Sequence, residues 1–165
     1  MTATAIVIDR AGKHKILLPD YALMLNDTEY ALSPAGPLIA RASKTDVVLS
    51  DIDRGVVLAS IDSGVNTSNV LSTSAELKEI GSLPPIGSQL TLITNRRSAN
   101  GVLRRTKGLF AVTTERITEP GEGGAPVLDS SGHLVAMGYA GTERGESELL
   151  SLKWAFDKAG LRLAP

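Results

Sequence analysis

A glycine-rich loop in the last third of the chain constrains the fold most strongly. It reads Gly-Glu-Gly-Gly-Ala-Pro from Gly121 to Pro126, and its apolar continuation leads through a turn at 130–132 into a second apolar run. Successive glycines let the backbone turn tightly and aim neighbouring N–H groups in one direction. Such a loop can cradle an anion or an oxyanion without side chains. An ordinary surface turn rich in glycine is the alternative interpretation.

Short β-rich runs separated by turn signals fill most of the remaining chain. The segment 83–87, Leu-Pro-Pro-Ile-Gly, is the best linker candidate, and about six such runs lie on either side of it. One segment, 152–159, has helical spacing and is followed by Gly160 as a stop. The pattern predicts an all-β fold of two small six-stranded antiparallel β-barrels, residues 1–82 and 83–165, with a C-terminal helix. A sandwich gives the same periodicity and stays open.

Asn100-Gly101 is the strongest tight-turn dipeptide in the chain, and it predicts a hairpin turn at that place. Five basic residues flank it and could make a basic hairpin over 96–107, namely Arg96, Arg97, Arg104, Arg105 and Lys107. A solvated face is the ordinary interpretation of such a charge run, and a polyanionic partner is the alternative.

Composition excludes several classes of site. The chain has 165 residues, 42% of them hydrophobic, and no cysteine, so disulfides and thiolate metal sites are ruled out. The only histidines, His14 and His133, leave little for a histidine-based metal site, and we expect no metal or cofactor. We interpret both as surface turn residues.

Charge and hydropathy bear on partners and location. A net charge of −1 gives no general case for nucleic acid or an acidic membrane as a partner. No apolar run approaches the roughly 18–20 residues of a membrane span. No basic region precedes the short apolar run at 5–8, so it is not typical of a signal peptide. We therefore expect a soluble, cytoplasmic protein.

The segment 121–141 resembles the nucleophile loop and following hairpin of trypsin-like (chymotrypsin-fold) serine proteases, in particular the compact bacterial type. The family writes that loop Gly-Asp-Ser-Gly-Gly/Ala-Pro. Glu122 stands here in place of the aspartate, and Gly123 stands where the nucleophilic serine belongs. We expect Glu122 to be a solvated loop carboxylate. The residues that match the family pattern are Gly121, Gly124, Ala125 and Pro126.

The resemblance extends over nearly the whole chain. Residues 5–17 are similar to the family's first hairpin, and 151–163 to its C-terminal helix and tail. On this register Tyr21 occupies the position of the catalytic histidine. Asp53 is the best match to the catalytic aspartate, with Asp51 as the alternative.

The resemblance thus implies a trypsin-like fold with degenerate triad positions Tyr21, Asp53 and Gly123. Serine-protease chemistry needs a hydroxyl nucleophile with a general base in hydrogen-bond reach. Glycine cannot form an acyl-enzyme, and tyrosine, with a reference pKa of about 10, is a poor base near neutrality. We therefore expect no catalytic residues and a pseudoprotease that serves as a scaffold or as a protein- or peptide-binding module. We also expect Tyr21 and Gly123 to face one another across a cleft between the barrels.

The resemblance also implies a binding site at the degenerate loop. The family builds its oxyanion hole from backbone N–H groups, which fall on Gly121 and Gly123 in this register. Backbone donors survive the loss of a side chain. The segment 121–124, with Gly121, Gly123 and Gly124 as the binding residues, is therefore predicted to bind a carboxylate such as a peptide C-terminus.

Two other functions stay open at this point. One is an active trypsin-like serine peptidase whose triad lies elsewhere in the chain, which labelling with a serine-directed phosphonate would reveal. The other is a polyanion-binding module that uses the 96–107 segment, although nucleic acid is disfavoured by the net charge. Salt-dependent retention on a polyanion column would separate this module from a peptide-binding one.

Overall fold

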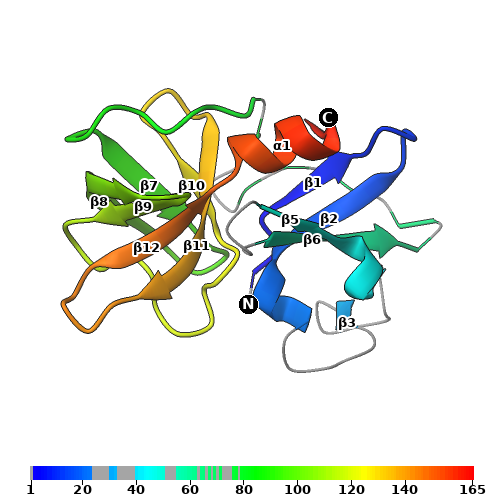
Figure 1. The fold of residues 1–165 in the computed structure, drawn as a ribbon, viewed down its shortest axis with the longest axis horizontal. Helices are drawn as coiled ribbons and strands as arrows, with labels where there is room; N and C mark the ends of the chain where they lie inside the picture. Colours follow the sequence, from blue (N-terminus) through cyan, green and yellow to red (C-terminus); the bar gives the residue numbers. More distant parts are fainter. Residues whose placement is uncertain are drawn as a thin grey trace. The chain divides into compact units, whose positions relative to one another are not determined.

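The computed structural model describes residues 2–23, 30–32, 40–50, 55–62, 64–65, 67, 69, 71, 76–77 and 79–165 (Figure 1). Contacts divide the chain into two units. The barrel unit comprises Met1–Thr4 and Val70–Trp154, and the sheet unit comprises Ala5–Asn69 and Ala155–Pro165. This grouping differs from the division at Leu83 expected from the sequence. The reason is that residues 155–165 return to the first half of the chain, where their final strand pairs with the first one.

The barrel unit is a closed antiparallel barrel in the order β10-β11-β12-β9-β8-β7 (Figure 1). Leucine, valine and alanine side chains fill its interior, as the aliphatic composition requires. Residues 134–138 are all buried, so both faces of that strand are covered. The strands are β7 (Gln89–Ile93), β8 (Ser98–Lys107), β9 (Phe110–Thr113), β10 (Pro126–Leu128), β11 (Leu134–Gly141) and β12 (Ser147–Ser151).

The sheet unit is a seven-stranded antiparallel sheet in the order β13-β1-β2-β6-β4-β3, with β5 also paired to β6. The sequence predicts six strands here, and the seventh is β13 from the C-terminal tail. Its core includes Ile16, Leu18 and Val57, together with residues of the 3₁₀ segment η1. The elements are β1 (Ala5–Ile8), β2 (His14–Pro19), η1 (Asp20–Leu23), β3 (Tyr30–Leu32), β4 (Ala40–Ala42), η2 (Lys44–Asp46), β5 (Val47–Leu49), β6 (Gly55–Ile61) and β13 (Arg162–Leu163).

The helix α1 (Lys153–Ala159) agrees with the predicted segment to within one residue. It buries Ala155 and Phe156, the positions that its spacing places on one face. Gly160 has a φ of +64°, and the N–H of Leu161 donates to the carbonyl of Phe156 at 2.9 Å. This is the Schellman arrangement, in which glycine takes the left-handed conformation that ends a helix.

The turn predicted at Asn100-Gly101 is wrong, because both residues lie inside β8. A Cβ on Gly101 would lie 2.9 Å from Cγ2 of Ile117, so the glycine allows a close approach inside the barrel. The actual β7–β8 turn lies at Thr94–Arg97. There the Thr94 N–H donates to the Arg97 carbonyl at 2.9 Å, and Oγ1 of Thr94 accepts the N–H groups of Arg96 and Arg97.

Candidate functional site

The 119–125 loop of the barrel unit contains two successive tight turns. The N–H of Glu122 donates to the carbonyl of Glu119, and the N–H of Ala125 donates to the carbonyl of Glu122, each at 3.0 Å. Gly121 and Gly124 have φ values of +89° and +88°, which only glycine adopts without strain. This backbone path therefore requires glycine at both positions.

Hydrogen bonds join the end of the loop to β11. The N–H of Gly124 donates to the carbonyl of Gly138 at 2.7 Å, and the N–H of Gly138 donates back to the carbonyl of Ala125 at 2.8 Å. A Cβ on Gly138 would lie 3.2 Å from the carbonyl oxygen of Glu122. Glycine at 138 thus lets the strand approach the loop closely.

The segment 2–4 also holds the loop. The N–H of Thr2 donates to the carbonyl of Gly123 at 2.8 Å, and Oγ1 of the buried Thr4 donates to the carbonyl of Gly124 at 2.7 Å. The same hydroxyl lies 3.7 Å from Sδ of Met137. The carbonyls on this side of the loop are therefore occupied by protein donors.

The N–H groups of Gly121 and Gly123 differ from their neighbours. Neither donates a hydrogen bond to any residue that the structure describes. Gly121 is exposed and Gly123 is half-buried. These two residues carry the donors that the sequence predicts for an oxyanion-type site.

Glu122 is paired, and the expectation of a solvated carboxylate is wrong. Nε of Arg97 donates to Oε1 at 2.8 Å, Nη2 of Arg97 donates to Oε2 at 2.5 Å, and the N–H of Glu119 also donates to Oε2 at 2.9 Å. The Glu122 side chain is only 14% exposed. The hydrogen bond from Arg97 holds the pKa of Glu122 below its usual value, and the same bond raises the pKa of Arg97.

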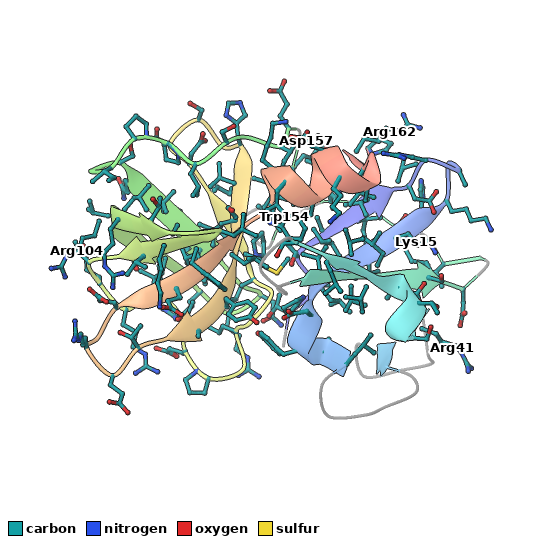
Figure 2. The ribbon with its side chains drawn as sticks, in the orientation of Figure 1. Lys15, Arg41, Arg104, Trp154, Asp157 and Arg162 are labelled. Carbon is teal, nitrogen blue, oxygen red and sulfur yellow. The ribbon has the colours of Figure 1, made fainter. Side chains whose placement is uncertain are left out.

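Two of the other basic residues expected in a 96–107 hairpin share one carboxylate. Nη1 of Arg104 and Nη2 of Arg105 bind the two carboxylate oxygens of Glu146 at 2.8 and 3.2 Å. Glu146 is buried, while Arg104 extends from the barrel (Figure 2). With Arg97 bound to Glu122, three of the five predicted cations are in ion pairs.

Neither histidine has the partners of a catalytic base. Nδ1 of His14 lies 3.1 Å from Oγ1 of Thr67, and no carboxylate among the described residues binds its ring. His133 has two carboxylates and no hydroxyl, with Nδ1 3.1 Å from Oδ2 of Asp129 and Nε2 3.3 Å from Oε2 of Glu79. His133 is therefore a half-exposed histidine beside the 130–132 turn whose ring contacts two carboxylates, in keeping with the surface turn residue expected from the sequence.

Asp129 holds the ring and backbone of His133 through hydrogen bonds. Burial raises the pKa of its carboxyl group, but hydrogen bonds from the backbone and ring of His133 and from the N–H of Ser131 outweigh burial and hold the pKa low.

No group of three or more His, Asp or Glu side chains that could hold a metal ion is found in the part of the chain that the structure describes. In the same residues no helix has the length and apolar character needed to span a bilayer.

The sequence and the structure of the chain were each compared with those of known proteins. No protein-family model and no curated protein matches the sequence. Solved structures do match. Nocardiopsis protease has a TM-score of 0.70 and 14% identity, covering 99% of this chain and 92% of its own. Thermobifida fusca protease A has a TM-score of 0.72 and 15% identity, covering 98% of this chain and 90% of its own. Cellulomonas bogoriensis chymotrypsin has a TM-score of 0.69 and 13% identity, covering 98% and 97%.

The chain has the trypsin-like fold. The all-β architecture predicted from the sequence, with its C-terminal helix, is thereby confirmed. The likeness at this level of identity concerns the fold and not the chemistry.

Two of the three triad positions predicted from the sequence lie among the described residues. Gly123 lies in the barrel unit, and Tyr21 lies half-buried on η1 of the sheet unit. Oδ2 of the neighbouring Asp20 accepts the N–H of Gly55 at 2.9 Å, which joins η1 to the start of β6. Asp53 and the alternative Asp51 lie outside the described residues. That Tyr21 and Gly123 face one another stays a prediction.

Proposed function

We propose that this chain is a catalytically inactive trypsin-like pseudoprotease that binds a protein or peptide through the 121–124 loop. One observation carries the proposal. The nucleophile loop keeps an ordered, multiply bonded backbone around a residue that has no side chain. An ordered loop that lacks the hydroxyl required for covalent catalysis supports a binding role over a catalytic one.

The partners of the two histidines support the loss of catalysis. A serine peptidase needs one imidazole between a hydroxyl and a carboxylate. His14 has the hydroxyl of Thr67 alone, and His133 has two carboxylates. An active peptidase with a different triad would need a base that these contacts do not supply.

The ion pairs favour peptide binding over the polyanion alternative. Glu122 and Glu146 form ion pairs with three of the five cations that a polyanion would contact, and their two negative charges offset most of the positive charge of those three. What the loop offers is a small number of backbone donors, which suits a single carboxylate better than a chain of phosphates. A hydrogen bond to a charged group contributes about 1.5–3 kcal/mol, so a terminal carboxylate bound by Gly121 and Gly123 would add measurable affinity.

The test compares short peptides of one sequence with free and with amidated C-termini. We expect the free peptide to shift the amide resonances of Gly121, Gly123 and Gly124, and the amidated peptide to shift them much less. The amide of Gly132 serves as an internal control, because this exposed turn N–H already donates to the carbonyl of Asp129 at 3.1 Å. Equal responses to both peptides, or none at the three loop glycines, would rule out the carboxylate site.

A further inference from the structure

The sheet unit has a surface cavity that the proposed peptide site does not use. Its volume is about 420 Å³, and it lies where β2 begins and β6 ends. This size is within the range of small-molecule sites, roughly 300–1,000 Å³. Its polar lining consists of Lys13, His14, Lys15, Ser60, Asp62 and Thr67.

One wall of the cavity is fixed by the β1–β2 turn. Oδ1 of Asp9 accepts the N–H groups of Ala11 and Lys13, each at 2.9 Å, and the N–H of Asp9 donates to the Lys13 carbonyl at 3.0 Å. The side chain thus closes the turn from inside, as aspartate does in Asx turns. The backbone that carries Lys13 is consequently held in place.

The floor is set by the pairing of β2 with β6. Lys15 and Ser60 are directly opposite one another in this register, and Nζ of Lys15 donates to Oγ of Ser60 at 2.7 Å. Lys15 is labelled in Figure 2. Because opposite residues of an antiparallel pair lie on the same face, the ammonium and the hydroxyl are presented together.

A buried amide lies two residues beyond Thr67, a residue of the opposite wall. Nδ2 of Asn69 donates to the carbonyls of Ile6 and Ala164 at 2.7 and 2.8 Å, and Oδ1 accepts the N–H of Ile6 at 2.6 Å. This side chain completes hydrogen bonds for β1 and for the end of the chain. Two residues before it, Oγ1 of Thr67 lies 3.1 Å from Nδ1 of His14.

The chemistry of the lining favours an anion. Lys13 and Lys15 against Asp62 leave one net positive charge, before any contribution from His14. The ammonium of Lys13 makes no ion pair or hydrogen bond with any residue that the structure describes. Two hydroxyls and an imidazole complete a set of groups that binds phosphate oxygens.

We infer that this cavity binds a phosphate-class oxyanion. The ammonium groups of Lys13 and Lys15 pair with the negatively charged oxygens, and the hydroxyls of Ser60 and Thr67 donate hydrogen bonds to the remaining oxygens. The cavity is larger than one such ion, and Asp62 is an acceptor for the hydroxyl groups of an attached organic part. The site is independent of the 121–124 loop, because all the lining residues that the structure describes belong to the sheet unit.

The test is a titration with inorganic phosphate at constant ionic strength, followed by the ring resonances of His14 and the amides of Ser60 and Thr67. We expect saturable shifts, and an affinity at least tenfold lower in the double variant Lys13→Gln, Lys15→Gln. The matched control is Lys107→Gln, an exposed lysine on the barrel unit, which should leave the affinity unchanged. Shifts that equal those produced by chloride, or an unchanged affinity in the double variant, would overturn the inference.

Two further arms identify the source of the oxyanion. If glucose 1-phosphate binds more tightly than inorganic phosphate, the site takes a phosphate monoester of a hydroxylated molecule. Equal affinities support a site for the free oxyanion. If glucose alone produces the same shifts as its phosphate, the anionic character of the site is refuted.

Discussion

Replacing Glu122 by glutamine removes one charge from the candidate loop and keeps the size of the side chain. The carboxylate accepts two hydrogen bonds from Arg97 and one from the N–H of Glu119. A fully exposed ion pair contributes about 0–1 kcal/mol, and breaking a fully buried one costs about 3–5 kcal/mol. Glu122 is 14% exposed and Arg97 is 31% exposed, so the pair lies between these limits. We expect Glu122→Gln to lower the free energy of unfolding by about 1.5–3 kcal/mol at pH 7.

The pH dependence of this effect has a definite sign. The folded protein holds the pKa of Glu122 below its ordinary value of 4.5, chiefly through the hydrogen bond from Arg97. The stabilisation is therefore complete above pH 4.5 and is lost as the pH falls through the lower folded value. The difference between wild type and Glu122→Gln should shrink steadily below that pH.

The assay is urea unfolding followed by the fluorescence of Trp154, the only tryptophan, whose indole N–H donates to the carbonyl of Ser151 at 2.7 Å. The matched control is Glu119→Gln. That side chain is 65% exposed and lies 3.8 Å from Arg97, so its loss should cost about 0–1 kcal/mol. A Glu122→Gln variant as stable as the control at pH 7, or a difference that grows in acid, would refute this reasoning.

Two other substitutions test the packing of each unit. Gly101→Ala should destabilise the barrel by about 1–3 kcal/mol, because the new Cβ would press against Ile117; an unchanged thermal midpoint would contradict the close approach. Asn69→Ala should cost about 2 kcal/mol, because it leaves the half-buried N–H and carbonyl of Ile6 and the buried carbonyl of Ala164 without this partner. Amide hydrogen exchange at Ile6 should accelerate in that variant, and wild-type protection there would count against the anchoring role of Asn69.

Local signals in the sequence predicted the features that local chemistry decides. The glycines at 121 and 124 have positive φ values at which serine or alanine would be strained, so the residue types alone indicate a tight loop here. The helix from Lys153 follows from apolar spacing and a glycine stop. The β-rich character follows from short runs between turn residues.

Features decided by tertiary contact could not be predicted. Asn100-Gly101 is a turn signal in isolation, yet this glycine serves a close approach to Ile117 from another part of the barrel. The hydroxyl of Thr94 closes the actual turn, which is a weaker signal. No local pattern indicates that Glu122 meets Arg97, because the two residues are far apart in the chain and come together only when the barrel closes.

The loss of the serine nucleophile is the central claim, and intact-mass spectrometry after treatment with a serine-directed phosphonate tests it most directly. An active trypsin-like peptidase treated in parallel shows that the reagent works. We predict no adduct on this chain, because Gly123 offers no hydroxyl and neither His14 nor His133 lies between a hydroxyl and a carboxylate among the described residues. A stoichiometric adduct mapped to any serine of the chain would contradict the pseudoprotease account.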